Sequence, residues 1–420
     1  MIPSRRTLLA GLASGALTAT AGCGSVLPGS SDGSTTQPTV PPDADPGEEA
    51  WRHPFSRRPY DVVRVADGYV ASLENQLVAL DTSGEVTWER SLAVYPVASL
   101  AGTPEGDLLV ISGEYGGFGG ASNVVLHRLA PDGSYRWEQP VDATTHLRFL
   151  AVGGGRVYAS TSDDVIGSGG HQLFALSLDD GGVRWTTDAG VVTGHNAVAT
   201  PDGVAVLDRT VTRYGDDGSV RWETAGRYQR RLFRDPETGR LYAPRDDGAG
   251  GYRLHALAPA DGSVVWRGPA MAGVPDRVEA SPDGLLVSAD GGAVALSRTG
   301  EERWRRGPEP AGRTSAVLAD GVAYLTVGAT ARAVGFVDGV QRWTAALSGT
   351  VDGHAVAVGE TAAFLDGRSI GPWHLRGFDV ETGDPVWRSE RVTTTLEPLA
   401  GDGRVYAVDQ ASGDLVALRL

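Results

Sequence analysis

Lysine is absent from this chain of 420 residues, so all 37 basic residues are arginines. The 52 acidic residues outnumber them, and the formal net charge is −15 at pH 7. An acidic surface repels nucleic acid and anionic membrane faces. The composition therefore predicts that neither nucleic acid nor an anionic lipid surface is a partner.

Cysteine occurs once, as Cys23, which excludes an internal disulfide and a cysteine-rich metal site. The chain also lacks a Cys-x-x-Cys-His haem motif and any His-x-x-x-His or Glu-x-x-His pair, and its eight histidines are scattered singly. There is no phosphate-binding loop with a lysine and no complete Gly-x-Ser-x-Gly elbow. We therefore expect no metal, no cofactor and no catalytic residues, which favours a non-catalytic protein over an enzyme without deciding between them.

Long apolar runs are missing as well, since the one after Arg6 ends at Ala21 and is too short and too rich in Gly and Ala for a membrane span. The 58 glycines and 24 prolines exclude a mostly helical protein. With 41% hydrophobic residues the chain has enough apolar surface for a core. The composition predicts a globular, glycine-rich β protein.

The N-terminus has the features of an export signal, because Arg5 and Arg6 precede the apolar run and small residues lead to Cys23. Thr20 to Cys23 resembles the lipobox of exported lipoproteins, although that family usually has Leu where Thr20 stands. The twin arginines resemble a Tat signal. We predict a signal peptide over residues 1–22 and a lipid on Cys23. An ordinary signal with an incidental cysteine is the alternative.

Residues 23–46 are rich in Ser, Thr, Gly and Pro and predict a flexible tether. With a lipid on Cys23, we expect the chain to be anchored to the outer face of the cytoplasmic membrane. Abundant Asp and Arg without Lys resembles the composition of exported proteins from salt-loving archaea. At molar salt the Debye length is only ~3 Å, so the repulsion between the many acidic side chains is screened. A GC-rich genome that encodes Arg in place of Lys is the other interpretation.

A repeated phrase begins after the tether and is best kept from Leu77 to Trp88, where an apolar run, a turn with Gly84 and a tryptophan follow one another. In each copy a glycine stands four residues before the tryptophan, and successive tryptophans are 37 to 49 residues apart. This period is typical of propeller blades. The tryptophans predicted to dock one blade on the next are Trp51, Trp88, Trp137, Trp185, Trp222, Trp266, Trp304, Trp343 and Trp387.

The two ends of the chain complement each other. The C-terminus stops after a third strand, and the missing outer strand stands at Gly47 to Trp51, directly after the tether. We predict a single closed β-propeller over residues 47–420, with four-stranded antiparallel blades and a ring closed by the N-terminal strand. The literal count is nine blades.

The phrase in Val78 to Trp88 resembles the repeat of the PQQ-like propellers, a family that includes quinoprotein dehydrogenases and BamB-type envelope lipoproteins. The resemblance implies a family norm of eight blades, so both counts stay open. It also implies PQQ and Ca²⁺ for an enzyme, but the vicinal disulfide of many such dehydrogenases is impossible here because Cys23 is the sole cysteine.

The loops between second and third strands vary most, and loops on a rigid scaffold concentrate binding residues. Solvated insertions without a partner are the alternative. The predicted binding-face residues are Tyr115, Phe118, Asp163, Asp164, Tyr252, Trp373 and His374. The main hypothesis is a non-catalytic scaffold that binds an envelope protein. The alternatives are a PQQ-dependent dehydrogenase and a surface protein that binds a glycan.

Overall fold

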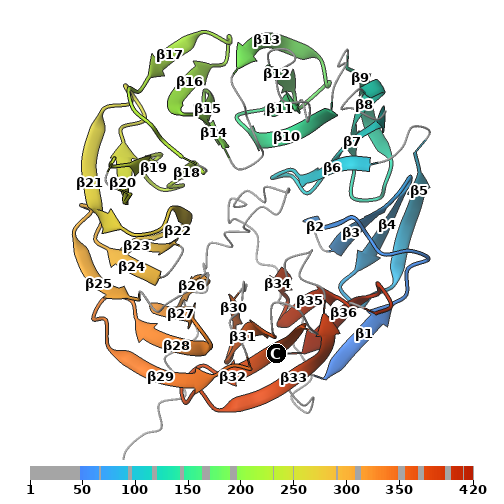
Figure 1. The fold of residues 1–420 in the computed structure, drawn as a ribbon. Coiled ribbons are helices and arrows are strands. Elements are labelled where there is room, and N and C mark those ends of the chain that lie inside the picture. The colour runs from blue at the N-terminus through green and yellow to red at the C-terminus, as the bar shows by residue number, and fades with distance from the viewer. Residues whose placement is uncertain are drawn as a thin grey trace, which may run out of the picture.

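A computed structural model (Figure 1) describes most of the chain after residue 47. The described ranges are 48–65, 68–92, 97–115, 121–141, 146–162, 171–189, 196–229, 231–248, 250–289, 292–307, 314–348, 355–367, 373–392, 399–409 and 411–419. The predicted signal peptide, the tether, Arg5, Arg6 and Cys23 lie outside them. No helix in the described part is long and apolar enough to cross a membrane.

The described strands form nine four-stranded antiparallel sheets, which follow one another around a central axis (Figure 1). This confirms the all-β propeller and decides the blade count at nine, against the family norm of eight. Blade 1 contains β2 to β5, each later blade takes the next four strands, and blade 9 combines β34 to β36 with β1.

The strands of blades 1 to 3 are β2 (Asp61–Val65), β3 (Gly68–Leu73), β4 (Gln76–Asp81), β5 (Val86–Ser91), β6 (Val97–Gly102), β7 (Leu108–Tyr115), β8 (Ala121–Leu129), β9 (Tyr135–Pro140), β10 (His146–Gly153), β11 (Arg156–Ser162), β12 (His171–Ser177) and β13 (Val183–Ala189). Those of blades 4 to 6 are β14 (Ala197–Thr200), β15 (Gly203–Asp208), β16 (Thr210–Gly215), β17 (Val220–Glu223), β18 (Phe233–Arg234), β19 (Leu241–Asp246), β20 (Tyr252–Leu257), β21 (Val264–Met271), β22 (Pro275–Ser281), β23 (Gly284–Ala289), β24 (Gly292–Leu296) and β25 (Glu302–Arg306). Those of blades 7 to 9 are β26 (Ala316–Ala319), β27 (Val322–Val327), β28 (Thr330–Gly335), β29 (Gln341–Ala346), β30 (Ala355–Val358), β31 (Thr361–Asp366), β32 (Trp373–Asp379), β33 (Pro385–Val392), β34 (Leu399–Gly401), β35 (Arg404–Val408), β36 (Leu415–Arg419) and β1 (Glu49–His53).

Burial along each blade follows the sequence pattern. The second strand β3 is buried at five of its six positions, whereas the outer strand β5 alternates between exposed and half-buried residues. An apolar run that is buried on both faces is the signature of a central strand, and alternation is that of a strand with one face in water. The hydrophobic clusters therefore lie between neighbouring blades, as in the cluster that joins β28 to β35.

The outer-strand tryptophans reach across to the next blade. Trp88 Nε1 donates to the Pro131 carbonyl oxygen at 2.8 Å, and its indole lies against Gly133, whose φ is +77°. Trp51, Trp137, Trp185, Trp222, Trp266, Trp304 and Trp343 donate to carbonyl oxygens in the same way. Trp387 is buried and lies against Gly377 of its own blade.

A β-bulge precedes the tryptophan in every blade, because the register between third and outer strands skips one residue there. In blade 1, Ala79 pairs with Trp88 and Leu80 pairs with Val86, so Thr87 is the extra residue. The same shift occurs in the other eight blades. A bulge bends the strand and re-aims a side chain. It explains why the phrase keeps a constant spacing between glycine and tryptophan.

The ring closes without a covalent bond, because β1 pairs with β36 from the other end of the chain. Trp51 Nε1 donates to the Thr82 carbonyl oxygen of blade 1 at 2.8 Å. Arg52 Nη1 contacts the carboxylates of Asp409 at 3.0 Å and Asp414 at 3.3 Å, which flank the turn between β35 and β36. The N-terminal strand thus belongs to blade 9 and contacts blade 1.

Candidate functional site

The meander topology gives the ring two faces. The turns between second and third strands lie on the same face as the blade-to-blade connections, and we call this face the loop face. Asp247 and Ala329 are exposed residues in its turns. The opposite turn face carries the first-to-second and third-to-fourth turns, with Ser134 and Thr299 exposed. Antiparallel strands require this division, since successive turns alternate between the two ends of a blade.

The binding residues predicted from the sequence lie on three or more blades rather than in one site. Tyr115 ends β7 in blade 2, and Tyr252 is half-buried at the start of β20 in blade 5. His374 is the second residue of β32 in blade 8 and is half-buried, and its Nδ1 donates to the Ser389 carbonyl oxygen at 2.9 Å. The predicted residues Phe118, Asp163 and Asp164 lie outside the described ranges.

Trp373 differs from the expectation of an exposed aromatic contact. Its side chain is 9% exposed and belongs to the hydrophobic cluster of blades 7 to 9, beside Leu375 and Val392. Burial of an indole of this size stabilises the core strongly. We therefore remove Trp373 from the residues available to a ligand on the loop face.

A serine, a histidine and a glutamate line up across blade 2. Ser112 Oγ lies 2.8 Å from His127 Nε2, and His127 Nδ1 lies 3.0 Å from Glu138 Oε1. The order is that of a nucleophile, a base and an orienting acid. Ser112 has no exposed surface, so no substrate reaches its hydroxyl in this arrangement. The three side chains link β7, β8 and β9. No local motif announces them, because only strand register brings them into line.

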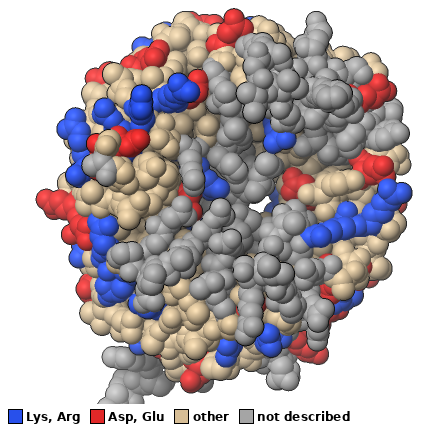
Figure 2. Space-filling view, in the orientation of Figure 1, with Lys and Arg blue, Asp and Glu red and all other residues tan. Residues whose placement is uncertain are grey.

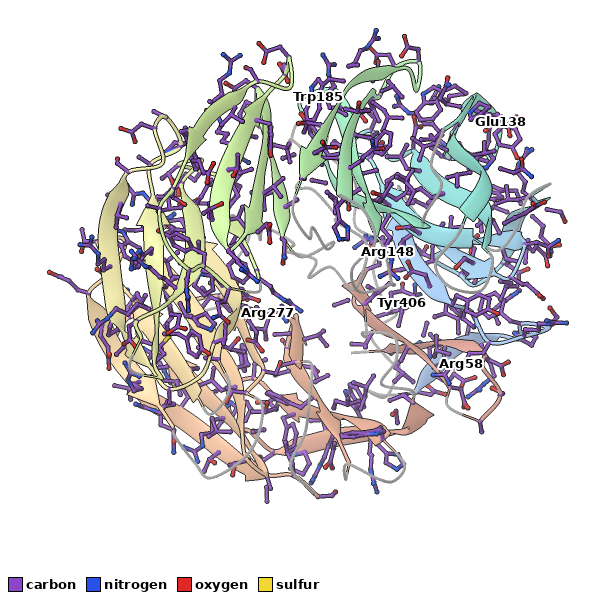
Figure 3. The ribbon with its side chains drawn as sticks, turned by 45° about the horizontal axis from the view of Figure 1, so that its top comes forward. Arg58, Glu138, Arg148, Trp185, Arg277 and Tyr406 are labelled. Atoms are coloured by element: carbon purple, nitrogen blue, oxygen red, sulfur yellow. The ribbon has the colours of Figure 1, made fainter. Side chains whose placement is uncertain are left out.

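Charged groups also stand on the inner strands. Arg277 of β22 points into the centre of the ring (Figure 3), and its Nε donates to Glu279 Oε1 at 2.8 Å. Glu279 Oε2 accepts the Leu318 backbone N–H at 2.6 Å, so it satisfies the free edge of the next blade's inner strand. Burial raises the pKa of Glu279, while the charge of Arg277 opposes that shift. On β2, burial raises the pKa of Asp61 to about 7.

These inner carboxylates do not fit the calcium-bound quinone of a dehydrogenase. Ca²⁺ takes roughly 6–8 oxygen ligands that converge on one point. Within the described ranges, no group of three or more His, Cys, Asp or Glu residues lies close enough together to hold a metal ion. Asp61 stands on blade 1, and Glu279 on blade 6 is already paired with Arg277.

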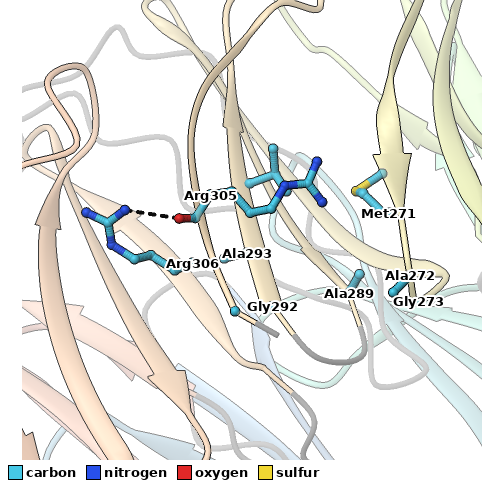
Figure 4. Close-up of a pocket in the computed structure, with 10 residues that line it drawn as sticks. Met271, Ala272, Gly273, Ala289, Gly292, Ala293, Arg305 and Arg306 are labelled. Carbon is cyan, nitrogen blue, oxygen red and sulfur yellow. Dashed lines mark hydrogen bonds between the residues drawn. The ribbon is translucent and has the colours of Figure 1, made fainter. Parts of the chain in front are cut away.

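Figure 4 shows a cavity between the ends of β21 and β25, lined in part by Met271, Ala289 and Arg305. Its volume of about 40 Å³ suits roughly one water molecule. Arg306 Nη1 donates to the Arg305 carbonyl oxygen at 3.0 Å, and Arg305 Nη2 donates to the Ala270 carbonyl oxygen at 3.0 Å. The cavity is a packing defect between blades and too small for an organic ligand.

His255 of β20 is a buried histidine of blade 5 whose pKa is shifted strongly from its ordinary value. It is 2% exposed, and its Nδ1 lies 3.3 Å from the Tyr228 hydroxyl. Burial, followed by the charges of Arg245, Arg267 and Arg253, lowers the pKa of His255 to about 4. At neutral pH the imidazole is therefore uncharged and surrounded by guanidinium groups. Sequence reasoning missed this cluster, because its members are separated in the chain.

The low pKa of His255 predicts acid sensitivity. Between pH 6.5 and 4 the unfolded chain binds a proton on His255 that the folded protein does not bind, so the free energy of unfolding decreases as pH falls. We expect wild type to lose up to about 3 kcal/mol over this window relative to His255→Gln. Urea unfolding of both proteins at several pH values measures the difference. The raised pKa of Asp61 has the opposite effect, because it makes the free energy of unfolding increase as pH falls. Both proteins contain Asp61, so its contribution cancels when their pH profiles are compared. Parallel pH profiles would contradict the prediction.

The amino-acid sequence matches a family model over more than half of its length. The family model described as outer membrane protein assembly factor BamB matches residues 121–281 and 289–420, more than half of the chain. No curated protein sequence matches the chain significantly.

Solved structures share the fold at low sequence identity. BamB from Moraxella catarrhalis is 15% identical, with a TM-score of 0.52 over 89% of this chain and 100% of that chain. The computationally designed Ika8 protein is 10% identical, with a TM-score of 0.52 and the same coverages of 89% and 100%. A quinohemoprotein alcohol dehydrogenase from Comamonas testosteroni is 13% identical, with a TM-score of 0.50 over 88% of this chain and 76% of that chain.

Proposed function

Because the chain belongs to the family of the outer membrane protein assembly factor BamB, we propose that it is a non-catalytic scaffold that binds another protein outside the cytoplasmic membrane. The observation that carries this proposal is the family match, which spans most of the ring. The name of that family describes an assembly factor, and a scaffold role for this chain is consistent with it.

The physical properties of the ring support a role in binding. Eight of the nine outer-strand tryptophans, all except Trp387, donate an indole hydrogen bond to the next blade, as Trp304 does to the Phe336 carbonyl oxygen at 2.8 Å. Buried apolar clusters add to these contacts between neighbouring blades. A scaffold of this kind holds its turns in place at little entropic cost when a partner binds. The loops of the loop face differ in length from blade to blade, so they are the part of the repeat that the ring constrains least.

The proposal includes the address of the protein. A lipid on Cys23 would hold the mature chain at the outer face of the cytoplasmic membrane, and the Ser/Thr/Gly/Pro-rich residues 23–46 would act as a tether between lipid and ring. Two arginines at positions 5 and 6 would direct export of the folded protein. Tethering would raise the local concentration of the ring near membrane-bound partners.

A pair of photo-crosslinkers tests the scaffold role. One is placed at Ala329 in a loop-face turn, and its control at Thr299 in a turn-face turn, since both positions are exposed. We expect irradiation of intact cells to give one discrete protein adduct from position 329 and none from position 299. Mass spectrometry then identifies the partner.

A second loop-face position, Asp247, checks that the adduct reports a binding face. The same partner is expected from positions 247 and 329, because both lie on the loop face, on blades 5 and 7, and one partner that covers this face reaches both. Equal labelling from both faces, or no adduct from either loop-face position, would count against protein binding through this face.

A further inference from the structure

Three arginines of blade 5 project from the same side of its sheet. Arg245 of β19 pairs directly with Arg253 of β20, and Arg267 of β21 pairs with His255, two residues further along β20. Paired residues, and residues two apart on one strand, share a face. Arg245, Arg253, His255 and Arg267 therefore form one continuous group, which we call the blade 5 arginine cluster.

The cluster carries unneutralised charge. Among the described residues, Arg245 and Arg267 have no ion-pair partner, and Arg253 Nε lies 3.9 Å from Asp247 Oδ2. Three guanidinium groups and one carboxylate leave a surplus of about two positive charges at neutral pH. Like charges placed directly across two strands destabilise a sheet. Although the whole chain has a net charge of −15, positive charge is in local excess here, and a bound anion would reduce the repulsion between the guanidinium groups.

Polar groups form the base of the cluster. Tyr228, in the connection that precedes β18, pairs opposite Arg245 and so lies on the same face. Its ring centroid is 5.8 Å from Arg245 Cζ, and its hydroxyl lies 3.3 Å from His255 Nδ1. Tyr228 and His255 are almost fully buried, at 3% and 2% exposed. Leu241 and Ala243 continue this face into the core between blades 4 and 5.

The guanidinium groups above this base are accessible. Arg267 is exposed, and Arg245 and Arg253 are half-buried. Figure 2 shows basic side chains, in blue, at the upper left over the outer strands β17 and β21, with acidic side chains, in red, beside them. A ligand reaches the cluster from the surface without any opening of the ring.

We propose that the blade 5 arginine cluster binds a phosphate dianion, either free or as a phosphomonoester. Guanidinium forks match the oxygens of phosphate in geometry and in charge. Arg245 and Arg253 are directly paired, which places their Cβ atoms only ~4.5–5.5 Å apart, and Arg267 lies diagonally from Arg253, at roughly 7–8 Å. This spacing suits a compact anion better than an extended acidic chain. The site does not depend on the scaffold role, and either proposal can fail while the other stands.

Titration of the whole folded protein with inorganic phosphate at constant ionic strength tests the site. The readouts are calorimetry and the ¹H–¹⁵N NMR signals of the His255 ring. We expect saturable binding that moves the His255 signals, and a loss of about tenfold in affinity for Arg245→Gln and for Arg267→Gln, the factor of one charge-assisted hydrogen bond. Arg221→Gln removes the same charge from an outer-strand arginine paired with Asp217 and is expected to leave affinity unchanged.

Thermal unfolding first confirms that each variant folds. Separate arms with glycerol 3-phosphate and with phosphatidic acid vesicles distinguish a soluble phosphomonoester from a lipid headgroup, and binding in either arm that the arginine variants weaken supports the site. Chloride that competes as well as phosphate does, or a hexaglutamate peptide that binds where phosphate does not, would overturn it. So would an affinity for phosphate that Arg221→Gln lowers as much as Arg245→Gln.

Discussion

A chain that begins at Phe55, and therefore lacks β1, is expected to lose cooperative folding. The deletion removes the hydrogen-bond partner of β36, the Trp51 indole packed on Gly84, and the ion pairs of Arg52 with Asp409 and Asp414. Loss of a packed tryptophan costs about 3–5 kcal/mol, and each backbone hydrogen bond adds about 0.5–1.5 kcal/mol. The sum is comparable to the whole stability of about 5–15 kcal/mol that domains have.

The exposed edge of β36 gives this variant a second expected property. An unpaired strand edge is a template for pairing with another chain, so the truncated protein should self-associate. Analytical ultracentrifugation and urea unfolding, each compared with a chain that begins at residue 46, measure both effects. The control retains β1 and lacks only the predicted signal peptide and the predicted tether up to residue 45. A truncated protein that stays monomeric and unfolds at the control's urea midpoint would show that the ring does not need its N-terminal strand.

Gly133→Ala is expected to destabilise the protein by about 2–5 kcal/mol, which combines a left-handed backbone with overpacking. The φ of Gly133 is +77°, and a Cβ built there would lie 2.6 Å from Trp88 Cδ2. The indole must then move, which breaks its 2.8 Å hydrogen bond to Pro131. Denaturant unfolding measures the loss.

Gly321→Ala separates the two causes. Gly321 has a similar φ of +73°, but a Cβ there meets nothing within 4 Å. We expect it to cost only the backbone term of about 1–2 kcal/mol. Equal losses in the two variants would mean that contact between glycine and indole contributes nothing to the joint between blades.

Much of the fold was readable from the chain because each blade repeats the same local chemistry. The turn in Leu77 to Trp88 shows how: Asp81 Oδ1 accepts the Ser83 backbone N–H at 2.8 Å, and Gly84 adopts a φ of +86°. Both are properties of residues a few positions apart. The split phrase at the two termini likewise predicted the pairing of β1 with β36, and the literal count of phrases predicted nine blades.

The candidate sites were not readable in this way. Trp373 has the sequence context of a loop aromatic, yet it lies in the core, because the start of β32 is covered by the neighbouring blades. Ser112, His127 and Glu138 are brought together by the register of β7, β8 and β9. A one-residue slip in any of these pairings would turn a side chain to the other face.

The sequence by itself determined the all-β repeat, its closing strand and its excess of acidic residues, since short-range spacing and composition carry all three. It left the blade count open between eight and nine, and the structure decided it. Only the tertiary structure decided where charge accumulates. Arg245, Arg253 and Arg267 are unremarkable in an arginine-rich chain until strand pairing sets them around His255. Electrostatic energy depends on distance in space, and that distance is defined by register and packing rather than by separation along the chain.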